Sequence, residues 1–250
     1  MTSKTKGETL LYLQREKFNV PKLILFNNFN YKKRKKKFIE KIKSKFKKKK
    51  IIVRSSSSSE DSTKFSNAGK FLSIGNIYAF QTKLVSDSID KVISSYKSKK
   101  NNQIIVQEMV KNVKISGVCS TVDLHNYQPV TVINYYTGKD TEVVTSGKKN
   151  TFSLSITDKK YLSKSHKFYK LLNEIEKLKK IYKSNLLDIE FAINSKNRVF
   201  ILQVRPIVIP KNKKIISKKF YLENIKRLKK KIIKLQEKNY DLFGNSNCFG

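Results

Sequence analysis

Hydrophobic residues recur along the chain at two spacings, one typical of helices and one typical of strands. The helical spacing predicts a short helix from Gly7 to Phe18, and the break at Val20-Pro21 separates it from a strand at Leu23 to Phe26. The same spacing predicts further helices at Tyr31 to Lys50, Thr82 to Lys100, Lys159 to Lys183 and Ile215 to Lys238.

Runs of β-branched residues predict strands in the middle of the chain. They lie at Ile51 to Val53, Ile104 to Val110, Ile115 to Val122, Val130 to Tyr135 and Thr151 to Ile156. Later in the chain, Leu186 to Ile193 and Val199 to Val204 flank the turn residues 194–197. Two strands around such a turn indicate a β-hairpin, so these last two strands are expected to pair.

Composition limits the class of protein. The 250 residues are 38% hydrophobic and 11% aromatic, which allows one large or two small domains and excludes a disordered chain. The 55 Lys and Arg exceed the 19 Asp and Glu, giving a net charge of +36 that ordinarily points to nucleic acid or an anionic membrane. The lysines are spread over every segment and accompany abundant Asn, Ile, Phe and Tyr, as in proteins from AT-rich coding sequences. We therefore expect no nucleic-acid partner, and we interpret Tyr31 to Lys50 as a solvated surface helix.

The cysteines and the apolar segments indicate the cellular compartment. Cys119 and Cys248 are far apart and belong to no C-x-x-C motif, so neither a disulfide framework nor a zinc site is expected. The residues up to Leu10 lack the apolar core of a signal peptide, and nowhere do about 18 apolar residues follow one another. A cytoplasmic protein with no membrane partner is expected.

Arg54 and the five serines that follow it are the first candidate site. They come directly after the strand Ile51 to Val53. Small hydroxyl residues at a strand end expose N–H and O–H donors, and the planar guanidinium of Arg matches phosphate oxygens. A serine run is also typical of a flexible linker. The residues alone leave both interpretations open.

The second candidate site lies on the predicted hairpin. Alternate residues of a strand share a face, so Asp188 and Glu190 lie on one side of the first strand, and Gln203 and Arg205 on one side of the second. Carboxylates and an amide oxygen are ligands that Mg²⁺ accepts together with nucleotide phosphates, and Arg neutralises phosphate charge. The alternative is that both carboxylates pair with lysines on an exposed strand.

Five motifs follow one another in the order found in one protein family. They are Lys6-Gly7 with Val20-Pro21, Val53 to Ser56 with Glu60-Asp61 and Ala68-Gly69, Val106 to Val110, Ser116 to Val118 with Thr121 and Asp123, and Asp188 to Ala192 with Leu202 to Pro206. Together they resemble the nucleotide-binding domain of phosphoenolpyruvate synthase and pyruvate phosphate dikinase. The resemblance favours a phosphate-binding loop over a linker at the serines.

This resemblance implies an ATP-grasp fold of the α+β class, in which two lobes clamp ATP. We expect the ATP-grasp domain at residues 1–210, with lobes at roughly 1–100 and 101–210, and a Lys-rich helical extension at 211–250. Some residues depart from the family pattern. Thr5 replaces a glycine before Lys6, Ser120 replaces an aromatic residue, and Leu124 replaces a proline.

The resemblance also implies roles for individual residues. The phosphates of ATP are expected to meet Lys6, Arg54, Ser55 and Ser56. The adenine is expected beside Gln107, Glu108, Met109 and Val110. The Mg²⁺ ligands are expected to be Asp188, Glu190 and Gln203. Arg54 and Arg205 are expected to take part in catalysis, with Arg205 steadying the transferred phosphoryl group.

The expected function is that of the Mg-ATP-binding phosphotransferase domain of a phosphoenolpyruvate synthase-like dikinase. In the full-length family, ATP, pyruvate and water give phosphoenolpyruvate, AMP and phosphate by way of a phosphohistidine. His125 is expected in a loop and His166 on the helix Lys159 to Lys183, and neither resembles that phosphohistidine. We therefore interpret the chain as a fragment or a split component, with pyruvate or another acceptor reached through further domains.

Two alternatives stay open. One is an ATP-dependent phosphotransferase with another small-molecule acceptor, because related enzymes reuse this domain. The other is a degenerate, non-catalytic ATP-grasp module that serves as a binding surface.

Overall fold

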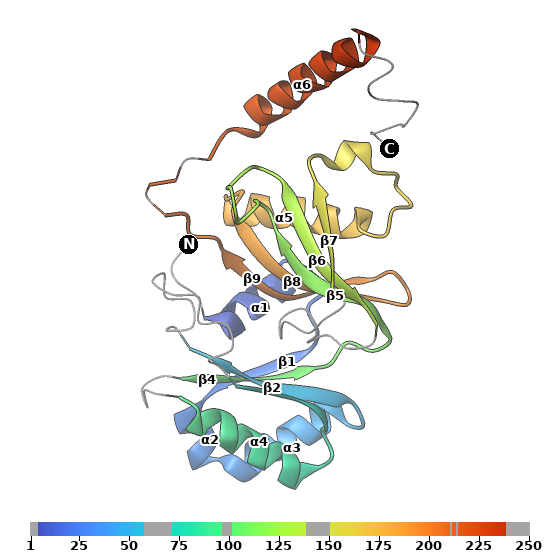
Figure 1. Ribbon diagram of the computed structural model, residues 1–250. Coiled ribbons are helices and arrows are strands. Elements are labelled where there is room, and N and C mark those ends of the chain that lie inside the picture. Colours follow the sequence, from blue (N-terminus) through green and yellow to red (C-terminus); the bar gives the residue numbers. More distant parts are fainter. Residues whose placement is uncertain are drawn as a thin grey trace.

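The computed structural model describes residues 5–57, 72–96, 102–138, 151–210, 212–213 and 215–238. Its strands form two antiparallel sheets (Figure 1), in the orders β1-β4-β2-β3 and β7-β6-β5-β8-β9. The first sheet contains β1 (Leu23–Asn27), β2 (Lys50–Ser56), β3 (Ser73–Tyr78) and β4 (Gln103–Glu108). The second contains β5 (Val113–Ser120), β6 (Thr131–Thr137), β7 (Phe152–Ile156), β8 (Leu187–Asn194) and β9 (Val199–Pro206).

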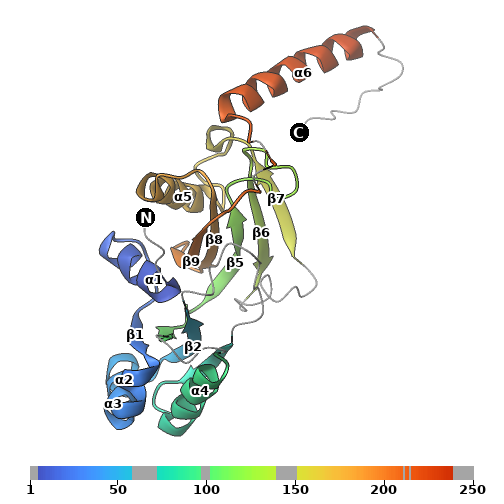
Figure 2. The ribbon, with the colours of Figure 1, turned by 90° about the vertical axis from the view of Figure 1, so that its left-hand side faces the viewer.

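Helices cover both sheets. They are α1 (Lys6–Arg15), α2 (Asn28–Lys33), α3 (Lys35–Phe46), α4 (Thr82–Ser94), α5 (Tyr169–Tyr182) and α6 (Lys218–Lys238). Figure 2 shows α2, α3 and α4 on the far side of the first sheet, α5 against the second sheet, and α1 between the two sheets. The predicted α+β class is confirmed, and two sheets with helices around them form the two lobes of the predicted ATP-grasp fold. The predicted domain boundaries stay a prediction.

Two predicted helices differ from the structure. The segment from Tyr31 to Lys50 was expected to be one helix, but α2 and α3 are separate and meet at Arg34. The helix expected from Lys159 begins only at Tyr169, after a single 3₁₀ turn at Lys159–Tyr161. Ser163 accepts a hydrogen bond from the Ser165 N–H at 3.2 Å, and such local bonds compete with a helix. His166 therefore lies in a loop, and its predicted place on a helix is wrong.

Side chains alternate between the two faces of the first sheet, and each face belongs to a different hydrophobic core. Ile51 and Val53 of β2 are fully buried against α3 and α4, on one face of the sheet. Ile105 of β4 faces the other way and belongs to the core shared by α1, α5 and the second sheet. Arg54 is the neighbour of Val53 and pairs with Ile105, so its side chain leaves β2 on the face that looks toward the second sheet.

The second sheet shows the same alternation. Ile189 and Phe191 of β8 are fully buried in the core with α5, as predicted. Asp188 and Glu190 consequently lie on the opposite face of β8. Cys119 of β5 is also in this core, and burial raises the pKa of its thiol well above the usual range, so it is not a reactive thiol.

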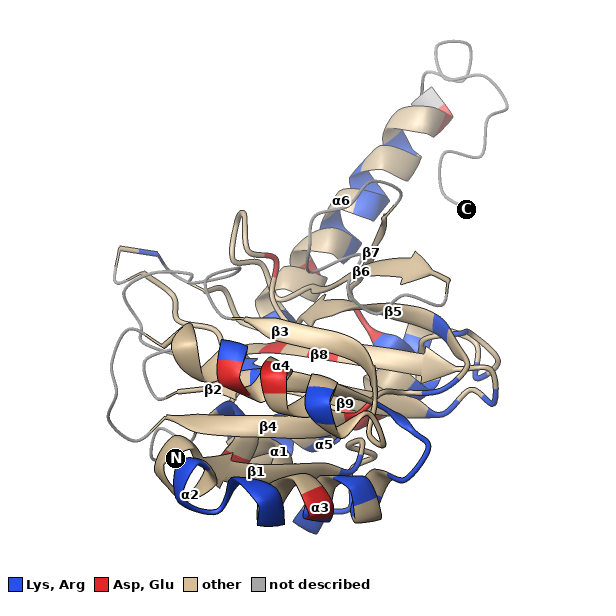
Figure 3. Ribbon diagram, turned by 90° about the horizontal axis from the view of Figure 1, so that it is seen from below, with Lys and Arg blue, Asp and Glu red and all other residues tan. Residues whose placement is uncertain are grey.

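Basic residues of the described part of the chain lie on several separate elements. Figure 3 shows Lys and Arg on α2, α3 and α6, with acidic residues interspersed on α3 and α4. Among the residues that the structure describes, no helix is both long and apolar enough to cross a bilayer.

Gly117, in the S-G-V segment of β5, pairs with Tyr135 of β6 and leaves no room for a side chain. A Cβ atom there would lie 2.3 Å from the carbonyl oxygen of Asn134 and 3.0 Å from the Cα of Tyr135. Because both are backbone atoms, the strands must separate to admit a side chain.

We predict that Gly117→Ala lowers the free energy of unfolding by about 1–3 kcal/mol, the usual cost of overpacking. Urea denaturation measures this change. Ser153→Ala, at an exposed position of β7 in the same sheet, is the control and should change stability little. Equal stability of both variants would show that β5 and β6 separate without cost.

Candidate functional site

The junction of the two sheets gathers most of the predicted site residues. Arg54, from β2, has a side chain that is only 11% exposed. Its Nη2 lies 3.3 Å from Oε2 of Glu190 and 3.4 Å from Oε1 of Gln203, both on the second sheet. One guanidinium thus joins a strand of the first sheet to two adjacent strands of the second.

A β-bulge in β9 completes the surroundings of Arg54. Glu190 pairs with Gln203, but Phe191 pairs with Ile201, so Leu202 is the extra residue. The Leu202 carbonyl accepts a hydrogen bond from Nη1 of Arg54 at 3.3 Å. The buried Nε of Arg54 has no hydrogen-bond partner among the described residues. An unsatisfied buried donor is costly, so a ligand with an acceptor oxygen would be stabilised here.

A second ion pair lies beside the first. Asp188 pairs with Arg205 across the hairpin, and Nη2 of Arg205 lies 2.7 Å from Oδ2 of Asp188. The predicted hairpin is confirmed, and its register, shifted by the bulge at Leu202, sets Asp188 beside Arg205 and Glu190 beside Gln203. The alternative, in which these carboxylates pair with lysines on an exposed strand, does not match this arrangement.

The two carboxyl groups differ in their pKa. Burial raises the pKa of Glu190, but the charges of Arg54, Lys6 and Arg205 outweigh burial, so the pKa lies below its usual value. Burial also raises the pKa of Asp188, and Arg205 offsets only part of this effect, so that pKa lies above its usual value. Opposite shifts on neighbouring carboxyl groups are common at functional sites.

Lys6 is the first residue of α1, and its charge helps to lower the pKa of Glu190, so the structure brings it toward the predicted site. The helix starts here because Thr5 and Glu8 form a capping box: Thr5 Oγ1 accepts from the Glu8 N–H at 3.3 Å, and Glu8 Oε2 accepts from the Thr5 N–H at 3.0 Å. Gly7 is buried against Leu25, where an added Cβ would lie 2.3 Å from Cδ1.

Ser55 and Ser56 hold the end of β2 in place. The Ser56 Oγ accepts from the Gly7 N–H at 2.9 Å, and the Ser56 N–H donates to the Tyr96 hydroxyl at 3.0 Å. The Ser55 N–H donates to the Leu72 carbonyl at 3.3 Å. These backbone donors are engaged within the protein, so their contact with phosphate stays a prediction. Ser58, Ser59, Glu60, Asp61, Ala68 and Gly69 lie outside the described residues.

The segment predicted beside adenine lies farther along the sheet. Glu108 pairs with Ile51, three residues from the level of Arg54, which is about 10 Å along a strand. Gln107 is buried and donates to the Pro21 carbonyl at 3.5 Å, and Glu108 forms an ion pair with Lys49 at 2.7 Å. Met109 and Val110 lie in the connection between the two sheets. The structure does not bring these four residues next to Arg54.

Neither histidine lies among the site residues. His125 is in an exposed turn, as predicted, and its N–H donates to Oδ1 of Asp123 at 2.9 Å. Nδ1 of His166 accepts from the Phe168 N–H at 3.3 Å.

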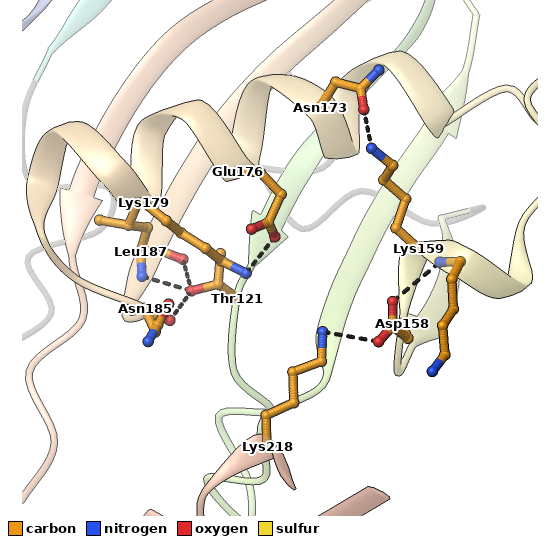
Figure 4. Close-up of polar contacts among 10 residues, drawn as sticks. Thr121, Asp158, Lys159, Asn173, Glu176, Lys179, Asn185, Leu187 and Lys218 are labelled. Carbon is orange, nitrogen blue, oxygen red and sulfur yellow. Dashed lines mark hydrogen bonds and ion pairs between the residues drawn. The ribbon is translucent and has the colours of Figure 1, made fainter.

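A cavity of about 1140 Å³ lies elsewhere, between α5, the strand ends of the second sheet and the residues that lead into α6. None of the predicted site residues lines it. Figure 4 shows that three of its lysines contact polar groups of the protein: Lys179 pairs with Glu176 at 2.9 Å, Lys218 with Asp158 at 3.5 Å, and Lys159 with Asn173. We therefore place the candidate site at Arg54 and not in this cavity.

Sequence reasoning missed two contributors to the site. The capping box Thr5-x-x-Glu8 was visible as a motif before an apolar run. Gln103 joins that box to the sheet, because its Nε2 donates to Glu8 at 2.9 Å and its Oε1 accepts from Thr5 at 2.6 Å. No local pattern marks Gln103, since its partners are more than ninety residues away.

Known proteins resemble the chain as follows. Residues 3–170 match the family described as "Pyruvate phosphate dikinase, AMP/ATP-binding domain". No curated protein matches.

Among solved structures, D-alanyl-alanine synthetase A from Vibrio cholerae is 15% identical with a TM-score of 0.46, covering 82% of this chain and 55% of that one. PH1788 from Pyrococcus horikoshii is 15% identical with a TM-score of 0.49, covering 83% and 92%. D-Alanine-D-Alanine Ligase from Helicobacter pylori is 16% identical with a TM-score of 0.45, covering 82% and 54%. The chain thus spans little more than half the length of the two D-alanine enzymes.

The opposite pKa shifts predict opposite effects of pH on two variants. Because the pKa of Glu190 is lowered by folding, its charge stabilises the fold at neutral pH, and that contribution is lost as the pH falls. Glu190→Gln should therefore cost most near pH 7 and least near pH 3. The pKa of Asp188 is raised by folding, so Asp188→Asn should gain stability relative to the unmodified protein as the pH rises.

Urea denaturation at several values between about pH 3 and pH 7 measures both effects. Each variant serves as the control for the other, since both replace a carboxylate by an amide on β8. Slopes of the same sign would contradict the assignment of charges at the junction.

Proposed function

The chain belongs to the family of pyruvate phosphate dikinase AMP/ATP-binding domains, and from this premise we propose that it binds Mg-ATP at the junction of its two sheets. The observation that carries the proposal is the contact of Arg54, on the first sheet, with Glu190 and Gln203 on the second. This contact assembles residues far apart in sequence into one polar site. The proposed ligand lies between the two sheets, and each sheet supplies part of the binding site.

The charges at the junction suit a polyphosphate. The cations that act on Glu190 are Lys6, Arg54 and Arg205. The buried Nε of Arg54 is a donor without an acceptor among the described residues. Guanidinium groups bind phosphate oxygens through charge-assisted hydrogen bonds. In the proposed complex, Lys6 and Arg54 hold the phosphates, and Gln107 to Val110 lie beside the adenine.

The donor set also fits Mg²⁺. Asp188, Glu190 and Gln203 offer two carboxylates and an amide oxygen on adjacent strands, which are hard oxygen ligands of the kind Mg²⁺ accepts. When bound, Mg²⁺ would neutralise phosphate charge and orient the phosphates. In the described structure each carboxylate instead pairs with an arginine.

An exchange of partners follows from this arrangement. When phosphates take over Arg54 and Arg205, Glu190 and Asp188 lose their counter-charges and become available for a metal ion. Nucleotide and metal should thus favour each other's binding, since each relieves the charge that the other leaves unpaired.

The proposed chemistry is phosphoryl transfer in a phosphoenolpyruvate synthase-like dikinase, with Arg205 steadying the transferred group. Catalysis of this kind depends on alignment and charge more than on covalent steps. The acceptor is proposed to come from another domain or chain, because neither His125 nor His166 lies among the described site residues. A phosphotransferase with another small-molecule acceptor would use the same residues.

A non-catalytic ATP-grasp module is the second candidate. It is favoured by one observation: the capping box at Thr5 and Glu8 turns the segment before Lys6 into a helix start, where the family has glycines.

Arg54→Ala should weaken ATP binding roughly ten-fold or more, the effect of losing a charge-assisted phosphate contact. Titration calorimetry with Mg-ATP measures the change. Arg198→Ala is the matched control, because it removes an exposed arginine from the distant turn of the same hairpin that carries Glu190. Equal affinity of the Arg54 variant and the unmodified chain would remove Arg54 from the site.

Nucleotide binding should depend on Mg²⁺, because the phosphates otherwise face Asp188 and Glu190. Glu190→Gln should reduce the gain in ATP affinity from added Mg²⁺ while the circular-dichroism spectrum stays the same. If the unmodified chain binds ATP equally well in excess chelator, the metal assignment is wrong.

The chain alone should not make phosphoenolpyruvate from Mg-ATP and pyruvate, since the site brings no histidine to the phosphates. It should show at most slow ATP hydrolysis. Coupled detection of phosphoenolpyruvate and AMP checks this outcome. Steady turnover by the chain alone would move the proposed acceptor to His125 or His166.

A further inference from the structure

Helix α6 stands apart from the two sheets. Figures 1 and 2 show it projecting beyond the second sheet, on the side away from the first sheet. It is 21 residues long, and Leu228 and Leu235 are 56% and 52% exposed. Its first turn is tied to the second lobe by the ion pair between Lys218 and Asp158 at 3.5 Å. The remaining turns present an exposed amphipathic helix.

The apolar residues of α6 follow a heptad pattern. They recur at alternating steps of four and three along one line of the helix: Tyr221, Ile225, Leu228, Ile232 and Leu235. This average spacing of 3.5 residues is that of a coiled-coil seam. The a positions carry the β-branched Ile225 and Ile232, and two of the d positions carry Leu228 and Leu235. Isoleucine at a with leucine at d favours packing of two parallel helices.

The charges of α6 disfavour a second copy as the partner. The helix carries nine Lys and Arg against two Glu, so two copies side by side would repel each other. The positions that flank the seam, e and g, include Lys229 and Lys231 and no Asp or Glu between Lys218 and Lys238. A copy-to-copy pair would therefore form no ion pair along its seam.

We propose that α6 is a docking helix for a helix of another protein that carries an apolar heptad seam flanked by Asp or Glu at its e and g positions. Such a helix buries the seam and places carboxylates beside a helix that carries an excess of Lys and Arg. An anionic bilayer would also attract the lysines, but it requires no alternation of isoleucine and leucine along the seam. Since Lys218 ties the start of α6 to Asp158, the partner would be held beside the lobe that carries Asp188 and Glu190. This proposal does not depend on ATP binding.

A pair of synthetic helices tests the proposal with the full chain. Both have three heptads with Ile at a and Leu at d; one has Glu at every e and g position, and the other has Lys there. The Glu peptide should bind at least ten-fold more tightly, and added salt should weaken its binding, as read by fluorescence anisotropy. Equal binding of the two peptides, or none, would overturn the proposal.

Variants distinguish the seam from other apolar surface. Leu228→Asp should abolish binding of the Glu peptide, whereas Leu84→Asp, at a leucine that is 45% exposed on α4 of the first lobe, should not. Lys229→Glu with Lys231→Glu should reverse the preference toward the Lys peptide. An unchanged preference would overturn the proposed role of these two lysines.

Two further measurements test whether a second copy of the chain or a membrane covers the seam of α6 instead. Sedimentation of the chain that shows dimers lost in Leu228→Asp would assign the seam to a second copy. Association with phosphatidylserine vesicles, together with no binding of the Glu peptide, would assign it to a membrane. Either result would overturn the proposal, and neither would affect the proposed ATP site.

Discussion

The contact of Arg54 with Glu190 is the interaction on which the candidate site depends. A largely buried guanidinium and a largely buried carboxylate each lose hydration on folding, and each is tolerated because the other is present. The pair also fixes the first sheet against the second, since Arg54 belongs to β2 and Glu190 to β8. Removing one partner leaves an unpaired buried charge, which is much more costly than the pair itself is stabilising.

This interaction suits a site that must open to a charged ligand. The distances from Nη2 of Arg54 to Glu190 and Gln203, 3.3 and 3.4 Å, are long for charge-assisted hydrogen bonds, and Nε makes none within the described residues. A phosphate oxygen could therefore improve on the partners that Arg54 has in the protein. The pKa shifts of Glu190 and Asp188 are opposite because the charges of three cations outweigh burial at Glu190, whereas burial prevails at Asp188.

Much of this arrangement could be predicted from sequence because side chains alternate between the two faces of a strand. The period of two along β8 and β9 predicted that Asp188 and Glu190 share one face and that the hairpin brings them near Gln203 and Arg205, but the exact pairing depends on the bulge at Leu202. The start of α5 was predicted ten residues too early, because its apolar period continued through a segment where serines form local hydrogen bonds. The bulge at Leu202 had no local signal, and yet it turns a carbonyl toward Arg54. Contacts between the two sheets join residues that are far apart in the sequence, so the spacing of residues does not predict these contacts.

The end of β2 shows how a short motif can serve stability and binding together. Val53 packs in the core of the first lobe, Arg54 reaches the second lobe, and the Ser56 hydroxyl accepts from the N–H of Gly7 at the start of α1. Three residues of one strand thus serve a core, a charge contact and a helix anchor. A change that moves β2 would displace Arg54 and the start of α1 together, and with it Lys6. The serines therefore contribute to the site through the placement of its cations, whether or not they touch the ligand themselves.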